Sequence, residues 1–129
     1  MTKTDTENPA GLAAAENALR TIRAPLAQGE YDLHALVAEA LGGAGLAFRH
    51  EAVLGPRCRI DFLCGGVGIE VKRGKPERAR LTAQLRRYAA TGALTGLIVV
   101  SESYVRVPPS LDGVPVRLIC LNRLWGIAL

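Results

Sequence analysis

The sequence predicts an α/β fold in which a mixed sheet is flanked by helices. With 129 residues, of which 49% are hydrophobic, the chain is long enough for one ordinary core and too short for two. Gly65-Gly66 lies between two apolar segments, which is typical of a β-hairpin. A later apolar run at residues 95–101 follows a helical segment and indicates a buried parallel strand. We therefore expect a polar, disordered tail over residues 1–9 and one domain over residues 10–129.

Two helices and one strand are expected before the hairpin. The first helix should begin at residue 10 and close at Pro25, because apolar residues recur every three or four positions. The second should cover residues 30–41 for the same reason. A strand over residues 46–54 follows, and its alternation places Phe48, His50 and Ala52 on one face.

The hairpin is expected to pair residues 58–64 with residues 67–73 across its two-residue turn. Counting outward from the turn gives the register: Cys64 faces Val67, Leu63 faces Gly68, Phe62 faces Ile69 and Asp61 faces Glu70. Side chains two residues apart share a face of a strand, so Lys72 should point the same way as Glu70. The opposite face should carry Ile60, Phe62, Ile69 and Val71.

Two carboxylates placed opposite each other, with Cβ atoms about 5 Å apart, destabilise a sheet unless a positive charge lies between them. We expect Asp61 and Glu70 to bind a divalent cation, Mg²⁺ or Mn²⁺, which prefers oxygen ligands and leaves positions for water and a phosphate. Lys72 would then orient the attacking water and stabilise phosphoryl charge. The alternative is structural: Asp61 is a solvated strand residue, and Glu70 and Lys72 form a surface ion pair.

The second helix offers further ligands. Relative to its apolar stripe, Glu39 falls on the far side, whereas Glu30 lies at the margin, with His34 one turn further on the same face. We therefore favour Glu30 over Glu39 as an additional acid and consider His34 as a metal ligand or phosphate contact. A histidine beside an apolar stripe is more often a structural hydrogen-bonding group, and this is the alternative for His34.

A third helix is expected from Pro76 to about residue 90, with the proline at its first helical position. Its buried stripe consists of Leu81, Leu85 and Tyr88, and Gln84 lies inside this stripe. An inward-facing amide needs hydrogen-bond partners, which a phosphate, a water, Lys72 or a neighbouring backbone group would provide.

The last part of the chain is expected to form a strand over residues 116–121. Between this strand and the central one, the proline- and glycine-containing residues 108–115 indicate a surface loop. Asn122 is expected to cap a final helical turn.

Positive charge is concentrated next to the proposed metal site. The chain has a net charge of +4, yet residues 73–87 hold six basic residues and one acid, a local charge of +5. No apolar run is long enough for a membrane span and no signal pattern is present, so a cytoplasmic location is expected. The three cysteines, an odd number, favour reduced thiols over disulfides, zinc or an iron-sulfur cluster.

The predicted order of a helix, a three-strand meander, a helix and a strand carries Asp61 and then Glu70-Val71-Lys72 on its second and third strands. This pattern, over residues 30–101, resembles the PD-(D/E)XK nuclease superfamily, the restriction-endonuclease-like αβββαβ fold. His34 upstream, with Gln84 and Tyr88 downstream, makes the chain similar to the branch of RecB, lambda-exonuclease and Cas4-like nuclease domains. Ile60 precedes Asp61 here, where the superfamily commonly has proline.

The resemblance implies a Mg²⁺-dependent deoxyribonuclease that hydrolyses phosphodiester bonds, with Mn²⁺ able to substitute. The implied catalytic residues are Asp61, Glu70, Lys72 and Gln84. The implied metal ligands are Asp61, Glu70, the carbonyl of Val71, Glu30 and His34. The implied nucleic-acid contacts are Arg73, Lys75, Arg78, Arg80, Gln84, Arg87 and Tyr88.

DNA is the expected partner, and no membrane contact is expected. A homodimer, or a larger assembly for DNA repair, recombination or defence against phage and mobile elements, is compatible with so small a domain. The alternative function is a catalytically silent or partner-dependent nucleic-acid-binding module of the same fold.

Overall fold

The computed structural model describes residues 9–25 and 31–126. Residues 1–8 of the predicted tail, and Glu30, lie outside the described residues. The first helix begins at Pro9, one residue earlier than expected, and ends at Leu19, well before Pro25. In the part of the chain that is described, no helix is both long and apolar enough to cross a membrane.

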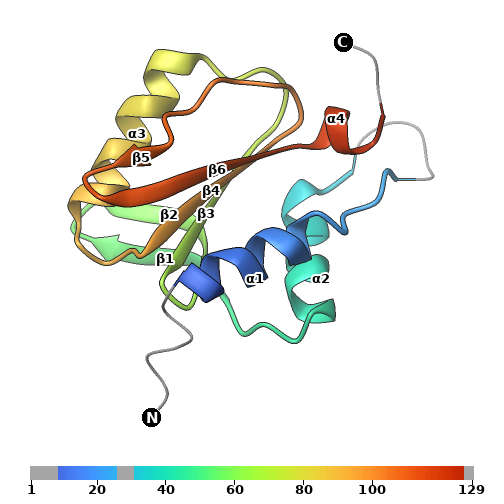
Figure 1. The fold of residues 1–129 in the computed structure, drawn as a ribbon, viewed down its shortest axis with the longest axis horizontal. Coiled ribbons are helices and arrows are strands. Elements are labelled where there is room, and N and C mark those ends of the chain that lie inside the picture. The colour runs from blue at the N-terminus through green and yellow to red at the C-terminus, as the bar shows by residue number, and fades with distance from the viewer. Residues whose placement is uncertain (1–8, 26–30, 127–129) are drawn as a thin grey trace.

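The strands form one mixed sheet with helices packed against it (Figure 1). The elements are α1 (Pro9–Leu19), α2 (Leu33–Gly43), β1 (Arg49–Gly55), β2 (Cys58–Cys64), β3 (Val67–Lys72), α3 (Arg78–Ala90), β4 (Gly96–Ser101), β5 (Ser110–Leu111), β6 (Val114–Cys120) and α4 (Leu121–Leu124). The strand order is β1-β2-β3-β4-β6-β5. Neighbours pair antiparallel from β1 to β3 and in β5-β6, whereas β3-β4 and β4-β6 are parallel. The predicted α/β class and mixed sheet are therefore confirmed.

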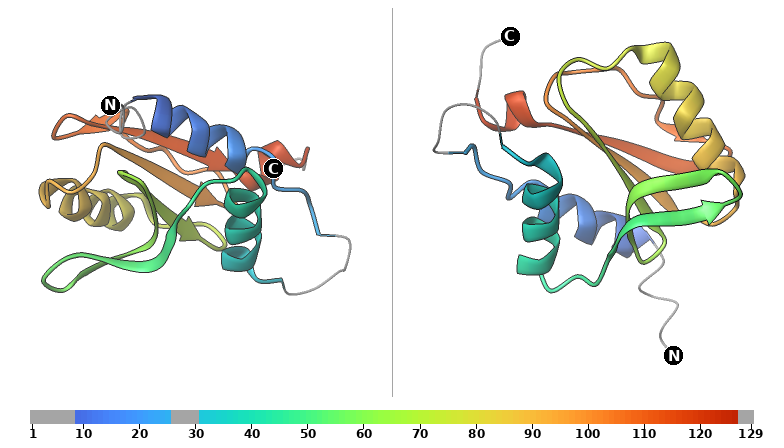
Figure 2. Two further views of the ribbon diagram at one scale, coloured as in Figure 1. Left: turned by 90° about the horizontal axis from the view of Figure 1, so that it is seen from below. Right: turned by 180° about the vertical axis from the view of Figure 1, so that it is seen from behind.

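Helices cover both faces of the sheet. α1 and α2 pack on one face and α3 on the other, as the two further views in Figure 2 show. β4 is buried along its whole length: Ile98 and Val100 join the core beneath α1 and α2, whereas Leu97 and Val99 join the core beneath α3. The apolar run that predicted a central parallel strand is continuous because it contributes to both cores.

β1 and β2 change face halfway along their length. His50 pairs with Phe62 and stacks on its ring on the side of α2, whereas the next pair, Ala52 with Ile60, belongs to the core beneath α3. A regular strand would keep residues two apart on one face, so the alternation is broken at Glu51, whose φ of 55° is left-handed. The expectations that Ile60 shares a face with Phe62, and Ala52 with His50, are therefore wrong.

Side-chain caps set the starts of two helices. α2 begins at Leu33, three residues later than expected, because the Asp32 carboxylate accepts a backbone N–H of the first turn. α3 begins at Arg78 rather than at Pro76, because the Glu77 carboxylate accepts two backbone N–H groups there. The capping acids, which the apolar pattern does not include, decide where each helix starts.

The predicted surface loop over residues 108–115 contains a hairpin. β5 pairs with β6 across Asp112-Gly113, and both turn residues have left-handed φ angles, 51° and 79°. Two such residues are what a tight hairpin turn requires, and Asp-Gly is among the strongest sequence signals for it. The expected final helical turn is α4, but its N-cap is Cys120 rather than Asn122.

Candidate functional site

β2 and β3 pair only near their turn. The ladder pairs are Cys64 with Val67, Leu63 with Gly68 and Phe62 with Ile69, as the register predicted. The expected next pair, Asp61 with Glu70, does not form, because the two strands separate at this point. Asp61 instead accepts the backbone N–H of Val71 through its side-chain Oδ2, at 2.7 Å.

The carbonyl of Val71 faces the same gap. An extended residue directs its N–H and C=O to the same side, because in a ladder it exchanges both with one partner residue. Since Val71 donates its N–H to Asp61, its carbonyl oxygen also points toward the gap between β2 and β3. The Val71 carbonyl and the Asp61 carboxylate, two of the predicted metal ligands, therefore both lie on the side of β3 that faces β2.

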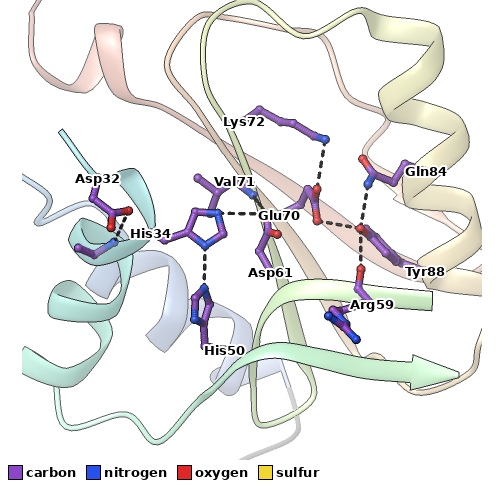
Figure 3. Close-up of polar contacts among 11 residues, drawn as sticks. Asp32, His34, His50, Arg59, Asp61, Glu70, Val71, Lys72, Gln84 and Tyr88 are labelled. Carbon is purple, nitrogen blue, oxygen red and sulfur yellow. Dashed lines mark hydrogen bonds and ion pairs between the residues drawn. The ribbon is translucent and has the colours of Figure 1, made fainter. Parts of the chain in front are cut away.

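Glu70 is the buried acid of the site, with 4% of its surface exposed. Its Oε2 lies 3.2 Å from Nζ of Lys72, and its Oε1 accepts a hydrogen bond of 2.8 Å from the Tyr88 hydroxyl of α3 (Figure 3). The predicted shared face of Glu70 and Lys72 is confirmed. Lys72 is partly exposed, so its ammonium reaches solvent although the acid does not. This burial is inconsistent with an ordinary surface ion pair.

Burial raises the pKa of Glu70 above its ordinary value of 4.5, and the nearby Asp61 carboxylate adds to this rise. The hydrogen bond from Tyr88 and the charge of Lys72 oppose the rise without cancelling it. The pKa of Tyr88 is raised as well, by burial first and then by the charge of Glu70. The tyrosine therefore stays protonated at neutral pH, and the charge of Glu70 is incompletely balanced.

Gln84 contacts the acid through Tyr88. Its amide donates to the Tyr88 hydroxyl at 3.0 Å, and the same hydroxyl lies 3.2 Å from the carbonyl oxygen of Arg59. A tyrosine was not among the partners expected for this amide. Because Tyr88 is 3% exposed, a direct contact between its side chain and a nucleic acid does not fit the structure.

Two histidines lie beside Asp61 on the side of α2. His34 Nδ1 and His50 Nε2 share a hydrogen bond of 2.8 Å, and His34 Nε2 lies 3.9 Å from Asp61 Oδ2. His34 thus lies next to Asp61, with which it was considered as a metal ligand. The sequence indicates that His50 and Glu51 are edge or rim residues of the sheet, with a distant ligand role left open for one of them. The contact of His50 with His34 could have been suspected from the position of His50 opposite Phe62, one residue from Asp61.

Glu30 and Glu39 are the two other acids that the prediction considered. Glu30 lies outside the described residues. Glu39 is exposed on α2 and borders a different cavity, next to the segment after α1. Within residues 9–25 and 31–126, no three His, Cys, Asp or Glu side chains are gathered closely enough to hold a metal ion. The three cysteines are free thiols, as expected.

A basic cavity opens beside the site. Lys72, Gln84, Arg80 and Arg87 border it, and its volume is about 400 Å³. Both arginines are exposed, and they lie on the flank of α3 that carries Gln84. The segment with the highest positive charge therefore adjoins the buried acid, as the sequence predicted.

The other predicted nucleic-acid contacts lie further away or are engaged elsewhere. Arg73 borders the same cavity, but its guanidinium bonds to the Glu102 carboxylate and to the backbone carbonyl of Tyr31. Arg78 lies on the opposite flank of α3. Lys75 borders the surface between the start of α3 and residues 104–106.

Comparisons of the chain with protein-family models, with curated proteins and with solved structures give no match. The chemistry of the site is therefore inferred from its own contacts. It combines a buried acid, a second acid at a gap between strands and an ammonium that reaches solvent. Such groups suit the binding of a cation and of a phosphate.

Proposed function

We propose that the protein is a metal-dependent nuclease that hydrolyses phosphodiester bonds in DNA, with the restriction-endonuclease-like core of the PD-(D/E)XK superfamily. The position of Glu70 carries the proposal: a buried acid pairs with Lys72 at 3.2 Å, next to the gap where the Asp61 carboxylate bonds to Val71. A structural ion pair needs no second carboxylate nearby, since like charges oppose folding. The order of α2, β1, β2, β3, α3 and β4 agrees with the resemblance on which the proposal also rests.

The donor set fits a hard divalent cation, Mg²⁺ or its substitute Mn²⁺. Asp61, Glu70 and the Val71 carbonyl offer oxygen atoms, and the raised pKa of Glu70 marks a negative charge that a cation would stabilise. A cation bound there would supply neutralising charge to a phosphoryl oxygen. His34 borders the same acid. Either His34 or Glu30, which lies outside the described residues, would complete the site.

Lys72 is the residue that we assign to the attacking water. Its ammonium is anchored by Glu70 at 3.2 Å, and its partial exposure leaves other N–H groups free to donate to a water on the solvent side. The same ammonium would also stabilise the charge that develops on the phosphoryl oxygens during hydrolysis.

Tyr88 and Gln84 position the acid rather than contacting the reacting atoms. Tyr88 donates to Glu70 Oε1, and Gln84 donates to Tyr88 from one turn earlier in α3. The two side chains hold one carboxylate oxygen at a fixed place, so the orientation of Glu70 depends on the packing of α3 against the sheet.

DNA is the proposed substrate because of the charge around the site. Arg80 and Arg87 border the cavity beside Lys72, and basic side chains bind backbone phosphates irrespective of base sequence. The proposed setting is DNA repair, recombination or defence, with the chain acting alone, as a homodimer or in a larger assembly.

A nucleic-acid-binding module without catalysis is the second candidate. It is favoured by the contacts of Glu70, both of whose carboxylate oxygens already have protein partners in Lys72 and Tyr88. Calorimetric titration with Mn²⁺ separates the two candidates. A binding heat that disappears in Asp61→Ala supports the metal site, whereas no heat in the wild type supports the binding module.

Cleavage of plasmid, single-stranded and branched DNA in Mg²⁺ or Mn²⁺ tests the nuclease directly. The wild type should cleave at least one substrate, and Glu70→Gln and Lys72→Ala should lower the rate by about 100-fold or more. Glu39→Gln is the matched control, because Glu39 is exposed on α2 away from the site, and it should cleave like the wild type. Equal cleavage rates for the wild type and Glu70→Gln would contradict the proposed function.

A further inference from the structure

α3 carries arginines on two opposite flanks. Arg80 and Arg87 lie with Gln84 on the flank that borders the site. Arg78 and Arg86 lie with Thr82 on the other flank, since residues four apart stack along one side of a helix. The second flank has no part in the site described above.

This second flank forms a groove with the segment that follows β4. Arg78, Thr82 and Arg86 line a cavity of about 310 Å³ together with Arg106 and residues 107–109. The three arginines are exposed, and none of the acidic side chains in residues 9–25 and 31–126 lines the groove. The adjacent Glu77 uses its carboxylate to accept N–H groups at the start of α3.

The arginines of the groove have no carboxylate partner among the described residues. None of its three arginines forms an ion pair with a carboxylate of the described residues, whereas Arg20, Arg59, Arg73 and Arg117 all do. Three guanidinium groups gathered around one cavity repel one another, so a bound anion stabilises this arrangement. Arginine is also the residue best suited to bind phosphate through two parallel hydrogen bonds.

We propose, on the basis of the DNA contact proposed above, that the groove of Arg78, Arg86 and Arg106 binds backbone phosphates of the second strand of a duplex whose first strand lies at the site. A helix with its side chains is about 10–12 Å across, close to the width of a B-DNA major groove, about 12 Å. Arginines on its two flanks therefore face opposite strands when it lies along such a groove. Between the flanks, the exposed residues Ala79, Ala83 and Ala90 allow a close approach.

Fluorescence anisotropy with a short duplex and with one of its single strands tests the assignment, in buffer without divalent cations so that nothing is cleaved. The variant Arg78→Gln, Arg86→Gln, Arg106→Gln should bind the duplex at least about 10-fold more weakly and the single strand like the wild type. The slope of log affinity against log salt should fall by roughly 3 for the duplex, about one for each lost phosphate contact. The matched variant Arg80→Gln, Arg87→Gln should weaken the binding of both substrates.

The assignment would be overturned if the triple variant bound the duplex as tightly as the wild type does. It would also be overturned if the triple variant lost as much affinity for the single strand as for the duplex. If the triple variant keeps its affinity for the duplex but no longer binds polyglutamate, the groove binds an acidic peptide instead, and the second-strand assignment is overturned. The three substituted arginines are exposed, so the triple variant should keep its fold, and circular dichroism checks this. Because binding is measured without cleavage, an inactive wild type that still shows the duplex effect would contradict the nuclease and leave the second-strand contact standing.

Discussion

Val71 donates its backbone N–H to the Asp61 carboxylate at 2.7 Å, where a regular ladder would direct it to Ile60. Cys64 and Val67 flank the two-residue turn as a hydrogen-bonded pair, and such pairs recur at every second position along an antiparallel ladder. Continued, this rule would pair Ile60 with Val71. A side chain thus replaces the main chain as the partner, and the strands separate without leaving this N–H unpaired.

Asp61 therefore has a structural role that can be separated from its proposed role in cation binding. Asp61→Ala removes the acceptor of the Val71 N–H and should lower the free energy of unfolding by about 1.5–3 kcal/mol, as for other hydrogen bonds to charged groups. Asp61→Asn keeps an acceptor oxygen and should cost less. Both variants should lose the Mn²⁺ binding heat. Urea unfolding without metal and calorimetry with metal measure the two effects, and equal stability of all three proteins would contradict the structural role.

Glu70→Gln should make the metal-free protein more stable at neutral pH. The pKa of Glu70 is raised in the folded state, so its ionised form destabilises the fold, whereas glutamine resembles the protonated acid. Below the ordinary value of 4.5 the acid is protonated in both states and the variant has no advantage. As the pH rises from 4.5 through the higher folded pKa, the wild type should lose stability relative to the variant, and above that pKa the difference should stay constant.

Thermal unfolding from pH 4 to pH 8 measures this difference. Saturating Mg²⁺ or Mn²⁺ should raise the midpoint of the wild type and not that of Glu70→Gln, because a ligand that binds only the folded state stabilises it. Glu39→Gln, at an exposed position of α2, should follow the wild type at every pH. A Glu70→Gln protein that is less stable than the wild type at neutral pH would show that its contacts with Lys72 and Tyr88 outweigh the cost of burial.

Tyr88→Phe should move the acidic limb of cation binding to higher pH. The hydroxyl donates to Glu70 at 2.8 Å and lowers the pKa of that acid, so its removal raises this pKa further. A higher pH is then needed to ionise Glu70. Titration with Mn²⁺ at several pH values measures the shift. Tyr104→Phe removes the hydroxyl of an exposed tyrosine outside the site and should leave the pH profile unchanged. A shift in this control as well would mean that losing any tyrosine hydroxyl changes the profile.

His50→Ala should weaken the proposed cation site although His50 does not touch it. His50 shares a hydrogen bond of 2.8 Å with His34, whose other ring nitrogen faces Asp61. Removing a partner that orients a ligand typically costs about 10-fold or more in metal affinity. His50→Gln retains a side chain that can hydrogen-bond to His34 and should recover part of the Mn²⁺ affinity. Unchanged affinity in His50→Ala would leave His50 with no role at the site.

The sequence predicted the hairpin register because a two-residue turn at Gly65-Gly66 leaves only one way to pair the strands. It did not predict where pairing ends. Glu51 adopts a left-handed φ that is unusual for glutamate, and nothing in its neighbourhood in the sequence marks that angle. The change of face that follows brings Ile60 under α3 and leaves Asp61 at the gap.

The contacts of the site depend on distances between elements, which the spacing of apolar residues in the sequence does not give. The spacing of Leu81, Leu85 and Tyr88 correctly predicted a buried face of α3. It could not show that the Tyr88 hydroxyl meets Glu70, because this depends on how far the helix lies along the sheet. The pairing of His34 with His50 likewise joins two elements whose relative position is fixed only by tertiary packing.

Gly68 tests the change of face in β2, because the switch brings Ile60 against it. A Cβ at Gly68 would lie 2.6 Å from Cδ1 of Ile60 and 3.1 Å from a methyl of Leu94. Ile60 is 0% exposed, so moving its terminal methyl requires the surrounding core to shift, and Gly68→Ala should lower the free energy of unfolding by about 1–3 kcal/mol. Gly42→Ala, where a Cβ meets nothing within 4 Å near the end of α2, should be neutral or stabilising by up to about 1 kcal/mol. Urea unfolding compares the two, and a Gly68→Ala protein as stable as the wild type would place Ile60 on the other face.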